Sequence, residues 1–390
     1  MKYGVLGAGM QGVAGAFDLA KFGNAEEVYL SDASLSPAQQ GADHINKLLG
    51  KKIVRAFQLE VQNKGELKKF LEPLDAIMSA VPYYLNPMIA SLCVQTKTHF
   101  NDLGGDTPTV QKELELDQSA RMADVSIIPD CGVMPGMGNH FAVHGIQQLD
   151  KTREVQVRCG GLPQHPKPPL GYKLVFSIEG LLNNYFGKAW ILRNGKVTEV
   201  DTFDGLEEID FPLPIGKAEA FTTTGATSTC PWTFEGKVDT WEYKTVRYPG
   251  HYEKILSLRS LGFLDTTPVI VKGISVIPQD VACVVIPPKI TFPDEPDLIV
   301  LRTIVMGTKD GKEVELQYEV LDFQDPVTGF SAMARCTAFS AGVITIMMAH
   351  RETPAGAIPL EKSVNQEKYI QELKRRGIQV TQRSKILRNP

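Results

Sequence analysis

Residues 3–12 read YGVLGAGMQG, a short apolar run that enters a turn rich in glycine. The glycines Gly7, Gly9 and Gly12 have the spacing G-x-G-x-x-G. Apolar side chains then recur at the spacing of one helix face, at Val13, Ala16, Phe17 and Ala20. A strand, a glycine turn and an amphipathic helix, in that order, begin a βαβ unit of the kind that binds a dinucleotide.

Each glycine of this turn has its own physical reason. Gly7 permits the tight turn, Gly9 lets a pyrophosphate approach the backbone, and Gly12 lets helix and strand pack closely. Asp32 ends the second predicted strand, about 20 residues beyond the glycines, where a carboxylate can accept from both ribose hydroxyls. It would repel a 2′-phosphate, and no Arg follows it directly. The pattern therefore favours NAD over NADP.

Strands and helices alternate over the first third of the chain, which predicts a parallel sheet with helices on both faces. Asn86 is expected to cap a helix that has Pro87 at its first position. Another helix is expected around 111–123. The predicted strands cover residues 3–6, 27–30, 76–81, 99–103 and 125–128.

Beyond Pro129 the pattern changes to strands joined by hairpins. Asn194-Gly195 is the expected turn in WILRNGKVTEV, and Asp310-Gly311 is the expected turn in LIVLRTIVMGTKDGKEVELQYEVL. Hairpins imply a mainly antiparallel sheet, so a second domain of α+β type is predicted. The fold class is α/β: a Rossmann-type parallel domain plus this second domain.

Composition limits the class of protein. The chain has 390 residues, of which 43% are hydrophobic and 22% charged, as in ordinary globular proteins. Its net charge of −4 gives no general attraction to nucleic acid or to anionic membranes. No signal peptide is predicted, and the apolar run 341–349 is too short to span a bilayer. The cysteines are widely spread and no metal-ligand spacing occurs, so a cytoplasmic protein with free thiols and no metal is expected.

Two loops are expected at the edge where the parallel strands end, the edge that holds the ligand in such sheets. They are SAVPYYLNP, residues 79–87, and NDLGGD, residues 101–106. Tyr83, in the first loop, is a candidate substrate-binding residue. The predicted cofactor contacts are Gly7, Gly9, Met10, Gln11, Gly12, Asp32, Ala80, Val81, Pro82, Leu103 and Gly104.

Several stretches together resemble the saccharopine dehydrogenase family. They are GAGMQG, DLGG, LELDQSARMADVSIIPDCGVMPGM, CGGLP, FSIEGLL, ILRNGK, EYKTVRYPGH and FSAMARCTAF, and they extend over nearly the whole chain. Within the family the similarity is greatest to bacterial lysine 6-dehydrogenases. The resemblance implies oxidation of the lysine side-chain amine to the 6-semialdehyde, with NAD taking the hydride and ammonia leaving. The aldehyde then cyclises onto the α-amine.

The resemblance also implies a domain plan. Residues 1–130 form the Rossmann domain, residues 131–333 form the substrate, catalytic and dimerisation domain, and residues 334–390 return to the first. A homo-oligomer, dimer or tetramer, is implied. One departure is informative: saccharopine reductases carry an Asp inside a G-x-x-P-G turn that contacts the large substrate, and this chain has Met134 there. Met134 leaves room for a smaller amine.

An amine dehydrogenase must remove a proton from its substrate, because hydride leaves the carbon of a neutral amine. Asp102, Asp130 and His251 are the candidate catalytic residues, and Glu179 could assist or bind the ε-ammonium. Each acid has an alternative reading as a loop or helix-cap carboxylate. The alternative role for His251 is structural, as a residue in the first turn of the helix HYEKILSLRSL.

Arg247, in TVRYPGH, is the best candidate to anchor the α-carboxylate of a small amino-acid substrate, because its planar fork matches a carboxylate. The alternative is a structural ion pair. Two other functions stay open. One is a saccharopine reductase acting on a secondary amine, and the other is an NAD-binding regulatory protein without catalysis.

Overall fold

The computed structural model describes residues 1–387, and its first sheet is parallel throughout, with the order β17-β6-β5-β4-β1-β2-β3. The order reverses between β1 and β4, the switch point where such sheets bind their ligand. The Rossmann-type sheet predicted from the alternation is thus confirmed. Its strands are β1 (Lys2–Leu6), β2 (Glu27–Asp32), β3 (Val54–Gln58), β4 (Ala76–Ser79), β5 (His99–Asp102), β6 (Ser126–Ile128) and β17 (Gly356–Ala357).

Neighbouring apolar residues of these strands enter two different cores. Val5 and Met78 lie in one core, whereas Leu6 and Ile77 lie in the other. Strands buried on both faces need such continuous apolar runs. One face is covered by α1 (Met10–Phe22), α2 (Leu35–Leu49) and α13 (Ala332–Ala349), and the other by α3 (Lys64–Leu71), α4 (Asn86–Thr96) and α6 (Asp117–Ala123).

Two local predictions in this domain were wrong. The helix expected over 111–123 is divided into α5 (Thr107–Leu114) and α6. Leu116 has ψ near 0° and donates to Glu113 O at 3.1 Å, so the chain leaves the α-helical pattern there. Asn86 is not a cap but the first residue of α4, and its Oδ1 accepts from Ser79 Oγ at 2.7 Å.

The second sheet is mainly antiparallel, as predicted, with a parallel pair between β7 and β12. Asn194-Gly195 and Asp310-Gly311 make the two hairpin turns, and all four residues have positive φ, between 52° and 73°. The strands are β7 (Lys151–Pro163), β8 (Lys188–Arg193), β9 (Lys196–Asp201), β10 (Glu207–Asp210), β11 (Lys217–Phe221), β12 (Thr240–Arg247), β15 (Asp297–Lys309), β16 (Lys312–Phe323) and β18 (Thr381–Ile386).

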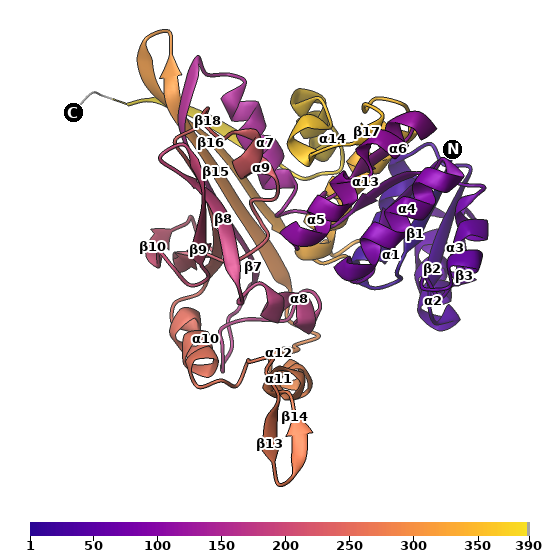
Figure 1. Ribbon diagram of the computed structural model, residues 1–390, viewed down its shortest axis with the longest axis horizontal. Helices are drawn as coiled ribbons and strands as arrows, with labels where there is room; N and C mark the ends of the chain where they lie inside the picture. Colours follow the sequence, from indigo (N-terminus) through magenta and orange to yellow (C-terminus); the bar gives the residue numbers. More distant parts are fainter. Residues whose placement is uncertain (388–390) are drawn as a thin grey trace.

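Shorter elements complete the described chain. A small hairpin and the helices α10 and α11 lie at one end of the second domain, away from the Rossmann sheet (Figure 1). The elements are α7 (Met137–Ile146), α8 (Ile178–Asn183), α9 (Cys230–Thr233), α10 (His251–Ser260), β13 (Val269–Val271), β14 (Ile274–Val276), α11 (Pro278–Val285), α12 (Pro287–Ile290), α14 (Gln366–Arg375) and the 3₁₀ turns η1 (Tyr83–Leu85) and η2 (Leu360–Lys362).

The carboxyl-terminal segment crosses back between the domains. Helix α13 packs on α1, β4 and β5, and Asn101 Nδ2 donates to Ala341 O at 2.9 Å. The 18 residues of α13 are mostly apolar, and 83% of them are buried, as in a core helix. Strand β17 then joins the first sheet, but β18 pairs with β16 of the second. The expectation that residues 334–390 return to the Rossmann domain is therefore wrong for 381–386, because β16 has an open edge that pairs with them.

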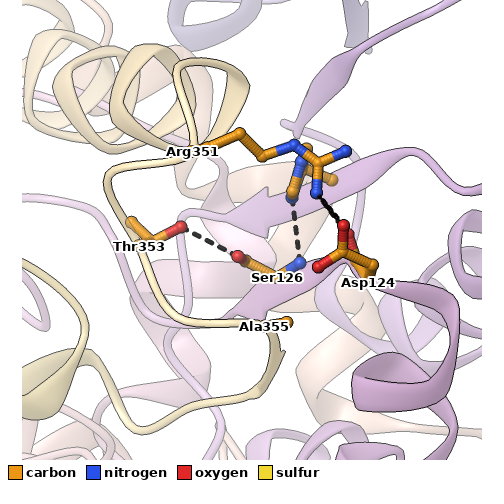
Figure 2. Close-up of a pocket in the computed structure, with 6 residues that line it drawn as sticks. Asp124, Ser126, Arg351, Thr353 and Ala355 are labelled. Atoms are coloured by element: carbon orange, nitrogen blue, oxygen red, sulfur yellow. Dashed lines mark hydrogen bonds and ion pairs between the residues drawn. The ribbon is translucent and has the colours of Figure 1, made fainter.

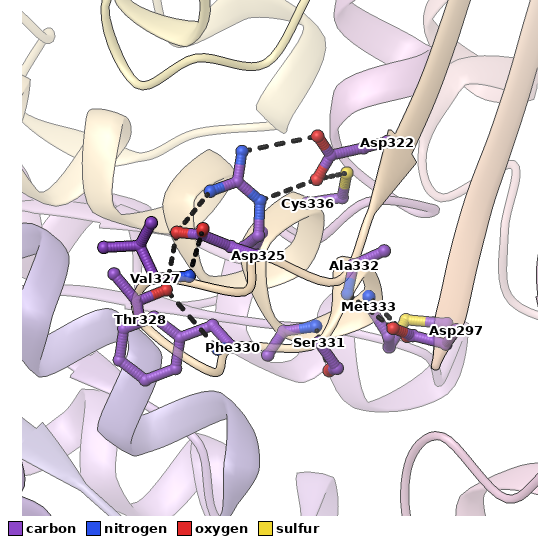
Figure 3. Close-up of polar contacts among 12 residues, drawn as sticks. Asp297, Asp322, Asp325, Val327, Thr328, Phe330, Ser331, Ala332, Met333 and Cys336 are labelled. Carbon is purple, nitrogen blue, oxygen red and sulfur yellow. Dashed lines mark hydrogen bonds and ion pairs between the residues drawn. The ribbon is translucent and has the colours of Figure 1, made fainter. Parts of the chain in front are cut away.

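The start of α13 is bound to the second sheet (Figure 3). Asp297 of β15 accepts from the N–H groups of Ala332 at 2.7 Å and Met333 at 2.9 Å. Arg335 binds Asp322 of β16, with Nε 2.8 Å from Oδ2. The helix is thus held by one sheet at its N-terminus and by the other along its length, which positions the two domains against each other.

Candidate active site

The glycine turn excludes side chains at two of its three glycines. Gly7 has φ +91°, and a Cβ there would lie 2.7 Å from Ala80 O. A Cβ on Gly12 would lie 1.7 Å from Gly7 O, so the turn and α1 pack backbone to backbone. These are the roles predicted for the two glycines.

The outer side of the turn is open. A Cβ built on Gly9 has no atom within 4 Å, and α1 begins at the next residue. The first N–H groups of a helix have no partner within it. Gln11 Oε1 is buried without a hydrogen-bond partner among the described residues. A free helix N-terminus and an open approach at Gly9 fit the pyrophosphate of a dinucleotide.

Asp32 stands beside this turn at the end of β2. Its Oδ2 accepts from Ala8 N at 2.9 Å, and its Oδ1 accepts from Ser34 N at 3.1 Å. These two hydrogen bonds fix the position of the carboxylate, and Asp32 stays partly exposed. Ala33, Ser34 and Leu35 follow it and bring no cation to the place of a 2′-phosphate.

Two predicted acids meet at the carboxyl edge of the sheet. Asp102 is the last residue of β5, and its Oδ1 accepts from Gly104 N at 2.8 Å and from Asp130 N at 2.9 Å. Asp130 has φ +65°. A Cβ on Gly104 would lie 1.9 Å from Asp130 Oδ1, so only glycine fits between them. Both carboxylates are almost completely buried.

Asp130 connects the domains. Its Oδ2 accepts from Ser228 Oγ at 2.5 Å, and its Oδ1 accepts from Gly105 N at 3.2 Å. Burial, with a smaller contribution from the charge of Asp102, raises the pKa of Asp130 to about 8. This carboxyl therefore exchanges its proton close to neutral pH, as a general base or acid must.

Glu113 is a third acid of this cluster that sequence reasoning missed. It lies on α5, fully buried, and burial followed by the charge of Asp102 raises the pKa of Glu113 far above its ordinary value. Neither carboxyl oxygen of Glu113 has a hydrogen-bond partner among the described residues, and a protonated Glu113 adds no negative charge to the cluster. A single Glu in a charged helix, KELEL, carries no sign of burial.

Arg247 ends β12 and is only 4% exposed. Its Nε donates to Tyr185 Oη at 3.3 Å and its Nη1 to Val246 O at 2.8 Å. Its Cζ lies 4.8 Å from the ring centroid of Tyr172. Among the residues that the structure describes, no carboxylate forms an ion pair with it. The structural ion pair considered as its alternative role is therefore not present in this part of the chain.

His251 lies in the first turn of α10, next to this arginine. Its Nδ1 is 3.2 Å from Leu170 O and its Nε2 is 2.9 Å from Tyr185 Oη. A carbonyl only accepts, so Nδ1 carries the proton and Nε2 accepts from Tyr185. Burial, with a smaller contribution from the charge of Arg247, lowers the pKa of His251 to about 3. His251 is thus neutral, with both ring nitrogens engaged.

The remaining candidates lie apart from these clusters. Glu179 is exposed in the first turn of α8, so the structure does not bring its carboxylate to the buried acids or to Arg247. Tyr83 is partly buried in η1, and burial, then the charge of Asp106, raises its pKa. Met10 is 54% exposed at the start of α1. The predicted cofactor contacts Ala80, Val81, Pro82 and Leu103 follow β4 and β5 at the carboxyl edge.

The chain from Phe221 to Ser228 runs between the acids and Arg247. Phe221 pairs with Thr245 of β12, and its ring is 6.3 Å from that of Tyr185. A Cβ on Gly225 would lie 2.5 Å from Gly105 O, so this loop touches the glycines after β5. This loop therefore joins the acid cluster, through Ser228 and Asp130, to β11, which pairs with the strand that ends at Arg247.

A separate cavity lies at the opposite edge of the first sheet (Figure 2). It has a volume of about 370 Å³ and is lined by His99, Asp124, Ser126, Arg351, Thr353 and Ala355. His99 and Ser126 begin β5 and β6, whereas the glycine turn and the acids lie where strands end. Burial, followed by the charge of Arg351, lowers the pKa of His99 to about 4, and its Nδ1 accepts from Ser126 N at 2.9 Å. This cavity is not part of the candidate active site.

Sequence comparison relates the chain to enzymes of one group. It is 32% identical over 182 residues to the mitochondrial alpha-aminoadipic semialdehyde synthase of Mus musculus, covering 44% of this chain and 19% of that protein. It is 28% identical over 222 residues to a saccharopine dehydrogenase [NADP(+), L-glutamate-forming] of Schizosaccharomyces pombe, covering 55% of this chain and 48% of that one. The chain spans less than half the length of these two relatives.

Structure comparison extends over the whole molecule. The apo saccharopine dehydrogenase (L-Glu forming) of Saccharomyces cerevisiae has a TM-score of 0.76 and 20% identity, covering 98% of this chain and 99% of that one. The fold is therefore shared. The saccharopine dehydrogenase NADP binding domain matches residues 4–128, and the saccharopine dehydrogenase C-terminal domain matches residues 132–378. The chain thus carries a pyridine-nucleotide-binding domain, and it belongs to the saccharopine dehydrogenase family.

Proposed function

We propose that this protein is an NAD-dependent dehydrogenase that oxidises the side-chain amine of L-lysine to the 6-semialdehyde. The observation that carries the proposal is Arg247, a buried cation without an acidic partner in the described structure. It is linked through the loop 221–228 to titratable acids beside the cofactor edge. A substrate with a carboxylate at one end and an amine at the other matches this pair of clusters.

In the proposed reaction each cluster has one task. Arg247 binds the α-carboxylate through its planar fork. Asp130, which becomes ionised as the pH rises through its pKa of about 8, receives the ammonium proton, because only the neutral amine releases hydride from its carbon. NAD held at the glycine turn would supply the acceptor for that hydride. Water then adds to the resulting iminium carbon, ammonia leaves, and the aldehyde closes onto the α-amine.

Asp32 supports NAD as the cofactor, since a carboxylate at the end of β2 can accept from both ribose hydroxyls and would repel a 2′-phosphate. The name of the Schizosaccharomyces pombe relative includes NADP, and the family domain that matches residues 4–128 is an NADP binding domain. The preference of this chain between NAD and NADP is therefore to be measured. Burial and the charge of Asp102 raise the pKa of Glu113, so Glu113 keeps its proton and adds no negative charge near Asp130.

A second candidate function is oxidation of saccharopine, a secondary amine, as in the relatives that bear this name. A third is nucleotide binding without catalysis. The deciding experiment measures reduction of NAD and NADP with lysine, ornithine, saccharopine and cadaverine. Turnover of lysine with NAD supports the proposal. Turnover of saccharopine alone supports the second candidate, and cofactor binding without turnover of any amine supports the third.

A further inference from the structure

The Tyr172 side chain lies beside Arg247 with its hydroxyl unused. Tyr172 is 1% exposed, and its Oη has no hydrogen-bond partner among the described residues. Buried hydroxyls are nearly always paired, because an unpaired one has lost its water without replacement. This hydroxyl therefore has a donor available for a bound molecule.

The groups around it select the charge of that molecule. The Arg247 guanidinium covers the Tyr172 ring at 4.8 Å, and the His251 ring packs edge-on at 5.4 Å. Tyr185 Oη accepts from Arg247 Nε and donates to His251, which is neutral. The cluster is one cation among neutral side chains, so it favours an anion and disfavours an ammonium group.

The geometry also leaves part of the guanidinium for a ligand. Tyr185 takes Arg247 Nε, and Val246 O takes Nη1, while Nη2 donates to no described residue. An unpaired N–H of Arg247 and an unpaired O–H of Tyr172 are both present at one buried position. A carboxylate has two oxygens and can accept from both.

We propose that Tyr172 is a substrate-binding residue that donates its hydroxyl hydrogen to one carboxylate oxygen of the amino-acid substrate while Arg247 binds the carboxylate as its counter-ion. This inference rests on the proposed function and adds a second recognition group to it. It assigns the site to compounds with a free carboxylate and disfavours plain amines.

Tyr172→Phe tests the inference, with Tyr318→Phe as the matched control. Tyr318 is equally buried, but its hydroxyl is paired with Gln148 Nε2 at 2.8 Å and with His144. The control should lower the melting temperature and leave substrate binding unchanged. Tyr172→Phe loses no hydrogen bond to a described residue and should not lower the melting temperature. It should raise the KM for the amino-acid substrate about 10- to 100-fold, and leave the KM for cadaverine unchanged.

Calorimetric titration with lysine and saccharopine separates this inference from the proposed function. Binding that weakens in Tyr172→Phe, without turnover in the parent, supports the inference and contradicts the function. Turnover and binding that are equal in parent and Tyr172→Phe contradict the inference alone. A fall in melting temperature as large as that of Tyr318→Phe would also overturn it, because the hydroxyl would then have a structural partner.

Discussion

Arg247 and Arg376 are both buried, but their surroundings differ. The Arg376 side chain is fully buried, and it pairs with Asp18, with Nε at 2.8 Å and Nη2 at 3.0 Å from the two carboxylate oxygens. Glu372 pairs with its Nη1 at 2.6 Å. Among the residues that the structure describes, the partners of Arg247 are a phenol, a carbonyl and an aromatic face. Burying a cation is costly unless an anion accompanies it. Arg376 therefore has its anion within the fold, whereas we infer that the anion of Arg247 is the substrate.

The largest expected effect separates the two arginines by stability. Arg376→Met should lower the free energy of unfolding by about 3–5 kcal/mol, because Asp18 stays buried without its counter-ion. Arg247→Met conserves volume and leaves no charge unpaired, so its loss should stay below about 1.5 kcal/mol. Urea denaturation of both variants measures the difference. Equal losses would contradict the distinction drawn here.

Substrate recognition should show the reverse order. Arg247→Ala should raise the KM for the amino-acid substrate roughly ten- to several-hundred-fold, since a hydrogen bond to a charged group contributes about 1.5–3 kcal/mol and its partner is left unpaired. Arg247→Lys should recover only part of this loss, because an ammonium has no planar fork. NAD affinity, followed by fluorescence titration, should hardly change in either variant. Joint loss of NAD binding and turnover would indicate misfolding instead.

The buried carboxyls make the free energy of unfolding depend on pH. The pKa of Asp130 is raised to about 8 from 3.8, so the folded state binds a proton that the unfolded state has lost. Its stabilising contribution is full below pH 3.8 and disappears as the pH rises through 8. The pKa of His251 is lowered from 6.5 to about 3, so below pH 6.5 the unfolded state binds a proton that the folded state does not. The contribution of His251 to the free energy of unfolding therefore falls as the pH falls below 6.5.

Between pH 6.5 and 8 the stability should therefore fall with rising pH, through Asp130 and Glu113 together. Each group contributes a slope of about 1.4 kcal/mol per pH unit where it is protonated only in the folded state. Asp130→Asn should make the slope of unfolding free energy against pH shallower by the contribution of one proton, about 1.4 kcal/mol per pH unit. Thermal or urea unfolding across this range gives the slope directly. A parent profile that rises with pH would show that these carboxyls are ionised in the folded protein.

The smallest expected effect concerns cofactor choice. Asp32→Ser combined with Ala33→Arg should shift the NAD to NADP preference by about tenfold, about 1.4 kcal/mol, by removing a repulsion and adding a phosphate partner. Calorimetry with both nucleotides measures this shift. Tighter binding of NADP by the unmodified protein would refute the role given to Asp32.

Local patterns predicted much of this molecule. The glycine turn, Asp32 and the hairpins at Asn194-Gly195 and Asp310-Gly311 follow from steric requirements of a few neighbouring residues, and their geometry is as expected. Asp102 and Asp130 were found because parallel strands end at one edge.

Features that depend on distant partners could not be predicted in this way. Glu113 is buried only because α5 turns it toward Asp102, and the sequence KELEL gives no sign of that. Tyr172 and Tyr185 reach Arg247 from loops far away in the chain. The pairing of β18 with β16 depends on an open sheet edge. Whether a buried arginine has an acidic partner is likewise a property of the folded chain.

The central claim is that the substrate carboxylate is the counter-ion of Arg247. The most direct measurement is the ratio of kcat/KM for lysine to that for cadaverine, which lacks the carboxylate, in the parent and in Arg247→Ala. This ratio should be about ten or more in the parent and should fall toward one in the variant. An unchanged ratio in Arg247→Ala would contradict the central claim.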